Sequence, residues 1–66
     1  MRVRLLYGGT WTDIESKEPL TIQDTLKRAG ISTSMVLVVH EDRILPHTTL
    51  IKSDIDLEAI DVGSGG

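Results

Sequence analysis

The sequence predicts an α+β fold in which one helix packs across a mixed sheet of four to five strands. Three observations lead to this class. The chain opens with a hairpin pattern, continues with one short helical pattern, and then shows alternating apolar segments typical of strands. Its 66 residues suffice for one small domain, which buries only about 60% of the surface that the unfolded chain exposes. So small a core leaves little room for an enclosed substrate pocket.

The first element is a predicted β-hairpin. Residues 2–7 begin with strict alternation, with Val3 and Leu5 on the core side, which indicates a half-buried strand. The pair Gly8-Gly9 tolerates the positive φ angles that a tight type I′ turn requires. Residues 10–16 are rich in Thr, Trp and Ile, and we expect them to return as the second strand.

A short helix is predicted between Thr21 and Gly30, which serve as its N-cap and its C′ stop. Asp24 stands where a capping box places its acid. One face of this helix is apolar and comprises Ile22, Leu26 and Ala29. Because an isolated helix of about two turns is unstable, it has to pack on the sheet.

The segment after the helix contains the most β-prone residues of the chain, residues 35–40. Residues 41–42 are predicted as a turn, and residues 43–45 as a short strand that ends at Pro46. Residues 47–54 are predicted as irregular, with room for one helical turn. No regular apolar period runs through them.

The last strand is predicted at residues 55–61, where Ile55, Leu57 and Ala59 lie on one face. In so small a sheet the first and last strands have to be neighbours, and they then run parallel. Residues 62–66 show no periodicity and are predicted as a flexible tail, so we expect the folded domain over residues 1–61.

Composition argues against several functional classes. The chain has no cysteine, and His40 and His47 lack the spacing of metal ligands, so no metal site is expected. The longest apolar run, residues 35–39, is too short to cross a bilayer, which indicates a cytoplasmic protein. A net charge of −3 without a basic stripe disfavours nucleic-acid binding. No arrangement of acid, base and nucleophile is recognisable, so we do not expect an enzyme.

Strand alternation also predicts a docking face. The side chains opposite the core positions share the open face of the sheet, and the large aliphatic ones are Leu6, Leu37, Val39 and Ile60. An exposed apolar patch on a monomer usually marks an interaction site. The alternative is a β-bulge that reverses one strand and moves some of these side chains into the core.

Residues 63–66, Gly-Ser-Gly-Gly, suggest a function for the end of the chain. Glycine lacks a Cβ, so Gly65 and Gly66 make a thin, flexible peptide that ends in a carboxylate. Such an end can enter a channel of a partner enzyme, where ATP-dependent adenylation activates the carboxyl group. The acyl adenylate can then accept sulfur, which gives a thiocarboxylate, or an amine, which gives an amide. The same composition is also typical of an incidental flexible linker.

The whole chain resembles the β-grasp sulfur carriers and ubiquitin-like modifiers, a group that includes ThiS, MoaD, the ubiquitin-related modifier and the small archaeal modifier proteins. The resemblance rests on the length, on the turn at Gly8-Gly9, on residues 21–26, 36–46 and 53–57, and on the ending Ser64-Gly65-Gly66. It implies a β-grasp, ubiquitin-like fold.

The resemblance also implies that Gly66 is adenylated and then thiocarboxylated or joined to a lysine by an isopeptide bond. The implied partners are a ThiF/MoeB-like adenylating enzyme and either a sulfur-accepting enzyme or lysines of target proteins. The chain itself is then a monomer that binds no cofactor. Its ending is most similar to that of the tRNA-thiolation carriers, and molybdopterin and thiamine synthesis remain open as destinations of the sulfur. The alternative is a stand-alone β-grasp interaction module whose tail is incidental.

Overall fold

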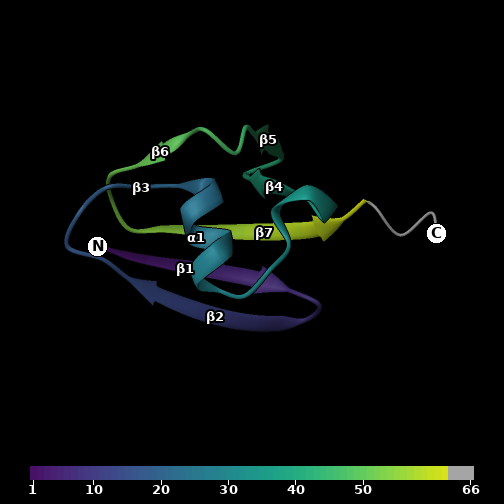
Figure 1. The fold of residues 1–66 in the computed structure, drawn as a ribbon, viewed down its shortest axis with the longest axis horizontal. Coiled ribbons are helices and arrows are strands. Elements are labelled where there is room, and N and C mark those ends of the chain that lie inside the picture. Colours follow the sequence, from purple (N-terminus) through teal and green to yellow (C-terminus); the bar gives the residue numbers. More distant parts are fainter. Residues whose placement is uncertain (63–66) are drawn as a thin grey trace.

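The computed structural model describes residues 1–62, which form two sheets and one helix (Figure 1). The elements in chain order are β1 (Arg2–Tyr7), β2 (Thr10–Glu15), β3 (Leu20–Thr21), α1 (Ile22–Arg28), the 3₁₀ turn η1 (Thr33–Met35), β4 (Val36–His40), β5 (Arg43–Leu45), β6 (Leu50–Ile51) and β7 (Ile55–Asp61). Five strands form the main sheet in the order β2-β1-β7-β4-β5, and β3 pairs with β6 in a small second sheet.

The centre of the main sheet is a parallel pair, β1 and β7, with Val3 opposite Ile55 and Tyr7 opposite Ala59. All other pairings in the sheet are antiparallel. The predicted α+β class and the predicted parallel contact between the first and last strands are therefore confirmed. Figure 1 shows α1 lying across one face of this sheet, and no helix or strand within residues 1–62 covers the opposite face.

The core lies between α1 and the covered face of the sheet. Eleven hydrophobic side chains are buried there: Val3, Leu5, Ile14, Leu20, Ile22, Leu26, Val36, Val38, Ile51, Leu57 and Ala59. The helix contributes Ile22 and Leu26 as predicted, but Ala29 is only partly buried and Thr25 is fully buried. Thr25 can be buried because its hydroxyl donates a hydrogen bond of 3.0 Å to the carbonyl of Thr21.

The start of α1 is fixed by its own cap and by a distant loop. The Thr21 Oγ1 accepts a hydrogen bond of 3.1 Å from the backbone N–H of Asp24, as an N-cap residue does. The N–H groups of Ile22 and Gln23 donate to the carbonyls of Thr49 and His47, each at 3.0 Å. Three of the N–H groups that a helix start leaves without partners are thereby satisfied, so this seven-residue helix does not depend on propensity alone.

The end of α1 has both hydrogen bonds of a Schellman motif. The N–H of Ile31 donates to the carbonyl of Leu26 at 3.0 Å, and the N–H of Gly30 donates to the carbonyl of Lys27 at 3.1 Å. Gly30 has a φ of +75°, which confirms the prediction of a C′ glycine.

Both hairpins of the main sheet turn through two residues of positive φ. Gly8 and Gly9 have φ values of 59° and 79°. The turn between β4 and β5 has the same form without glycine, because Glu41 and Asp42 have φ values of 50° and 66°. Side chains disfavour this left-handed region, so the second turn is strained relative to the first.

The prediction for residues 47–54 was wrong. The structure has a strand there, β6, with Leu50 opposite Thr21 and Ile51 opposite Leu20. Two residues are too few to show an alternating period, and the pairing depends on a segment thirty positions away in the chain. The buried side chain of Ile51 accounts for the position of this strand.

Candidate protein-binding face

The open face of the sheet carries one row of side chains that crosses all five strands. The register places Trp11 of β2 beside Leu6 of β1, Leu6 beside Glu58 of β7, Glu58 beside Val39 of β4, and Val39 beside Ile44 of β5. We call Trp11, Leu6, Glu58, Val39 and Ile44 the central row. Four of its five members are large hydrophobic residues, and Trp11 and Ile44 are 46% and 62% exposed.

A second apolar pair flanks the central row on the side where β7 ends. Leu37 and Ile60 lie opposite each other in the β4–β7 ladder and are 38% and 42% exposed. The structure thus places Leu6, Leu37, Val39 and Ile60 on one face, as the alternation predicts, and the ladders run through these positions without a bulge. That these four side chains bind a partner remains a prediction.

Trp11 and Ile44 extend the predicted patch to both edges of the sheet. Strand alternation alone did not single them out, although the hairpin turns contain the necessary signal. A two-residue turn at Gly8-Gly9 fixes Trp11 opposite Leu6, and a two-residue turn at positions 41–42 fixes Ile44 opposite Val39. Reading the register outward from each turn would have found both residues.

On the side of the central row toward the start of β7, the open face carries charged side chains. The Nη1 of Arg4 lies 3.5 Å from the Asp56 carboxylate and its Nε lies 3.9 Å from that of Asp13. The same guanidinium lies 4.5 Å from the centre of the Trp11 ring, which is a cation–π contact. Arg4 therefore joins the charged side of the face to the apolar row.

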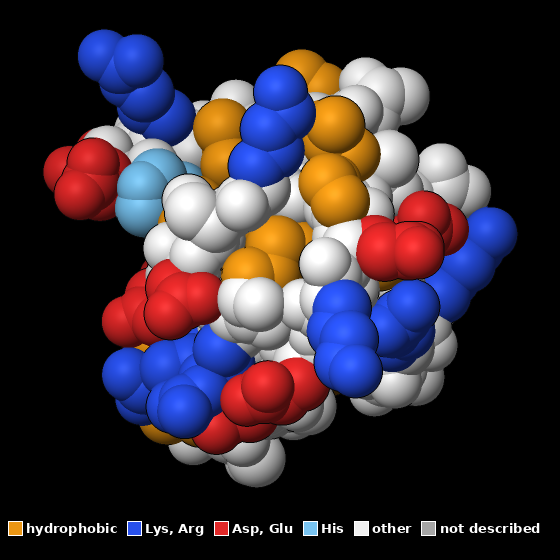
Figure 2. Space-filling model, turned by 90° about the vertical axis from the view of Figure 1, so that its left-hand side faces the viewer, with side chains coloured by type: hydrophobic (Ala, Val, Ile, Leu, Met, Phe, Trp, Pro, Cys, Tyr) orange, Lys and Arg blue, Asp and Glu red, His pale blue; other side chains and the backbone are white. Residues whose placement is uncertain are grey.

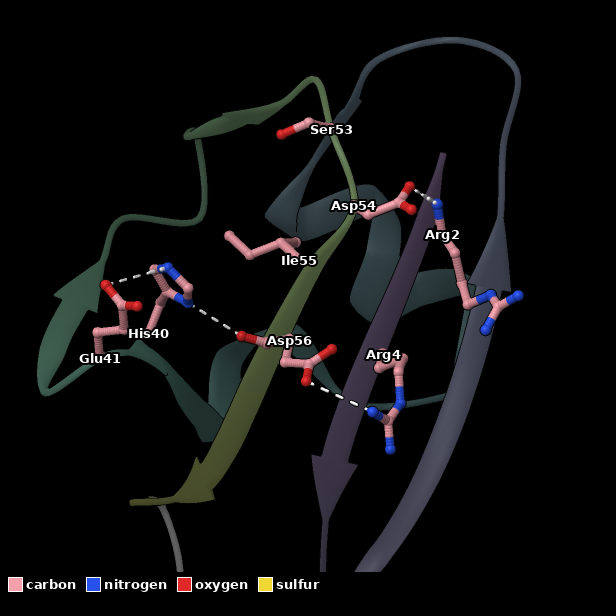
Figure 3. A pocket seen from close by; sticks show the side chains of 8 residues that line it. All are labelled: Arg2, Arg4, His40, Glu41, Ser53, Asp54, Ile55 and Asp56. Atoms are coloured by element: carbon pink, nitrogen blue, oxygen red, sulfur yellow. Dashed lines mark hydrogen bonds and ion pairs between the residues drawn. The ribbon is translucent and has the colours of Figure 1, made fainter.

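A shallow groove continues this charged region to the end of the sheet where β7 begins (Figure 3). The backbone N–H of Arg2 donates a hydrogen bond of 2.7 Å to Asp54, and the Nδ1 of His40 donates one of 3.0 Å to the Asp56 carbonyl. Figure 2, which looks onto this end of the molecule, shows acidic and basic side chains interleaved around apolar ones. Most polar groups in the groove are therefore engaged in holding the strands together.

The described chain offers no metal centre and no membrane span. Within residues 1–62, no three His, Asp or Glu side chains are grouped so that they could hold a metal ion. In the same part of the chain, no helix is both long and apolar enough to cross a bilayer.

The end of β7 is fixed on both sides, immediately beyond Ile60. The hydroxyl of Tyr7 donates a hydrogen bond of 2.9 Å to the carboxylate of Asp61, and the N–H of Val62 donates one of 3.0 Å to the carbonyl of Met35. The predicted site at Gly65 and Gly66, and most of the predicted tail 62–66, lie outside the described residues.

Comparison with known proteins identifies the class of fold. No protein-family model and no curated protein matches the sequence. Among solved structures, the fold is similar to that of a chain in the crystal structure of ATBAG1 in complex with HSP70, with a TM-score of 0.71 and 16% sequence identity. The match covers 92% of this chain and 40% of that chain. This likeness and the mixed sheet with its single helix define a β-grasp, ubiquitin-like fold.

Proposed function

We propose that this chain is a ubiquitin-like interaction module that binds a partner protein through the open face of its sheet. The observation that carries the proposal is the central row, together with the pair Leu37 and Ile60. Apart from Glu58 these side chains are apolar, and they project from the face that no element of residues 1–62 covers. Large apolar side chains gathered on one exposed face of a monomer usually mark an interaction site.

The composition of the face suits protein recognition. Trp11 is of the residue type most enriched among side chains that dominate binding energy at interfaces. Each large aliphatic side chain of the face contributes roughly 1.5–3 kcal/mol if a partner buries it fully, and less in proportion to what is already covered. The crystallised chain of similar fold was solved in complex with another protein, HSP70, which fits a role in protein binding.

A photo-crosslinking experiment tests this proposal. One variant carries a photoreactive amino acid at position 44, on the open face, and a matched variant carries it at position 50. Leu50 is a suitable control because it is also a large exposed aliphatic residue, 48% exposed, but lies on β6 outside the main sheet. We expect a discrete protein adduct from position 44 in living cells and none from position 50. The adduct should disappear when Trp11→Ala is added.

Equal adduct formation from both positions, or none from position 44, would contradict the proposal. Each variant needs a thermal melt that matches the parent chain, so that a lost adduct reports lost contact rather than unfolding.

The second candidate function is the carrier activity implied by the sequence resemblance. It is favoured by one relationship: the pair Leu37 and Ile60 lies beside the end of β7, and Gly65 and Gly66 follow within a few residues. A partner bound to the open face would then have the Gly66 carboxylate within reach. In this candidate a ThiF/MoeB-like enzyme transfers AMP from ATP to the Gly66 carboxylate with release of pyrophosphate. Sulfide then displaces the AMP and leaves a thiocarboxylate, or a lysine amine displaces it and forms an amide with loss of a proton.

Intact-mass analysis after co-expression with such an adenylating enzyme tests the carrier activity. The expected result is exchange of one carboxyl oxygen for sulfur, or an amide adduct, which deletion of Gly65 and Gly66 abolishes. If the full-length chain shows neither the oxygen-to-sulfur exchange nor an amide adduct, and the deletion leaves the crosslink from position 44 unchanged, the chain acts as an interaction module alone.

A further inference from the structure

We infer that the open face selects a partner segment that carries a Lys or Arg side chain between apolar side chains, and that Glu58 binds this cation. The inference rests on the proposed function, because it specifies the chemistry of the partner that the same face takes.

Glu58 lies at the middle of the apolar surface. It belongs to β7, the central strand, with Leu6 of β1 opposite on one side and Val39 of β4 opposite on the other. Within residues 1–62 its carboxylate forms no ion pair. A partner that covers the central row must remove water from this carboxylate, and a desolvated charge without a counter-charge is strongly unfavourable.

The cations of the open face are already engaged elsewhere. Arg4 lies near Asp13 and Asp56 and against the Trp11 ring, and Arg2 pairs with Glu15 at 3.3 Å. The register places two arginines and four carboxylates on this face of β1, β2 and β7, which leaves a net charge of −2. The counter-charge for Glu58 therefore has to come from the partner.

A small hollow lined by Glu58 has the size and chemistry to take a long cationic side chain. It has a volume of about 230 Å³, and its apolar walls are Leu6, Trp11 and Val39. Its lining also contains His40, whose ring lies 3.7 Å from the Glu41 carboxylate, and four carboxylates, which belong to Glu41, Asp42, Asp56 and Glu58, but no Lys or Arg. Lys and Arg side chains fit such a place because their hydrocarbon stems pack on apolar walls while the charged head reaches a carboxylate.

The same feature argues against a second copy of this chain as the occupant. In a two-fold symmetric dimer whose axis passes through the middle of the central row, Glu58 of one copy would meet Glu58 of the other. Two like charges would then lose their water together. A wholly apolar partner fails for a related reason, because it offers Glu58 no counter-charge.

Selection from a random peptide library tests the inference. The library is displayed on phage and selected against the parent chain, against Glu58→Gln and against Glu58→Lys. Glu18→Gln is the matched control, because Glu18 is an exposed glutamate in the loop between β2 and β3. We expect peptides enriched on the parent chain to share a Lys or Arg flanked by apolar residues. Their affinity should fall on the order of tenfold or more on Glu58→Gln and stay unchanged on Glu18→Gln. Glu58→Lys should enrich Asp or Glu at the same peptide position.

The outcomes separate this inference from the function on which it rests. Peptides that lose binding with Ile44→Ala, yet carry no basic residue and ignore Glu58→Gln, would overturn the inference and leave the proposed function standing. Failure to select any peptide that depends on Ile44 would count against the proposed function itself. If Glu58→Gln instead makes the chain self-associate in sedimentation without weakening peptide binding, Glu58 serves to prevent aggregation and the inference is wrong.

Discussion

The hydroxyl of Tyr7 donates a hydrogen bond of 2.9 Å to the carboxylate of Asp61 and thereby joins the ends of the two central strands. Tyr7 is the last residue of β1, and Asp61 is the last residue of β7. The contact closes the parallel pair at the end from which the chain continues to Gly65 and Gly66.

This contact predicts a measurable change in the ionisation of Tyr7. The hydrogen bond to Asp61 raises the pKa of Tyr7 above its ordinary value of 10.0, and the negative charge of Asp61 acts in the same direction. Asp61→Ala should therefore lower the pKa of Tyr7, whereas Asp24→Ala, on the helix, should not. Tyr7 is the chain's single tyrosine, so an absorbance titration of tyrosinate measures it directly.

The sign of the pH effect on stability follows from the same shift. Because the folded-state pKa of Tyr7 is raised, its contribution to stability is fully present below pH 10 and is lost as the pH rises through the folded-state pKa. Tyr7→Phe should remove this alkaline loss in urea unfolding experiments. An alkaline loss of equal size in Tyr7→Phe would show that another group causes it.

The turn between β4 and β5 predicts a stabilising substitution. Asp42 has a φ of 66° at the second position of a type I′ turn, where glycine is preferred. Asp42→Gly should raise the free energy of unfolding by about 0.5–1 kcal/mol, because relief of strain exceeds the added entropy of the unfolded chain. Asp42→Ala should not stabilise, since alanine tolerates positive φ less well than aspartate. A gain with alanine equal to that with glycine would contradict this explanation.

Substitution of Gly30 should lower the free energy of unfolding through backbone strain alone. Its φ is +75°, and a Cβ added at this position would meet no atom within 4 Å. Gly30→Ala should therefore lower the free energy of unfolding by about 1–2 kcal/mol without any steric clash. Gly30→Asn should cost less, because asparagine adopts the left-handed region more readily. Equal losses for the two variants in chemical denaturation would argue against the C′ role.

Truncation of Leu26 measures how much the packing of α1 on the sheet contributes to the stability of the domain. Its side chain is fully buried between α1 and the sheet, so Leu26→Ala should cost about 2–5 kcal/mol. Domains of this size have total stabilities of roughly 3–10 kcal/mol, so this variant should lose a large part of its stability and unfold at a clearly lower urea concentration by circular dichroism. The neighbouring exposed Lys27 gives the control, and Lys27→Ala should change the stability by less than about 0.5 kcal/mol.

The fold was largely predictable because its signals are local. Alternation defined β1 and β7, and the cap residues Thr21 and Gly30 bounded the helix. The short strands β3 and β6 were missed because each has two residues, and their pairing arises only when the helix start docks on the loop near Thr49. Local pattern therefore identified the long elements and missed those that tertiary contacts create.

The candidate face was predictable in part for the same reason. Alternation identified Leu6, Leu37, Val39 and Ile60 as outward-facing. It could not show that Glu58 lies between Leu6 and Val39, because the register of a parallel pair is set by the packed core and not by a connecting turn. The charged centre of the face, on which partner choice depends in our proposal, is visible only in the folded chain.

Two-dimensional NMR of the ¹⁵N-labelled chain, titrated with the protein that crosslinks to position 44, tests the central claim most directly. The claim is that the open face binds a partner. It predicts shifted or broadened amide signals at the central row and at Leu37 and Ile60, with the signals of α1 and β6 unchanged. Changes confined to α1, β3 and β6, with the central row unaffected, would contradict it.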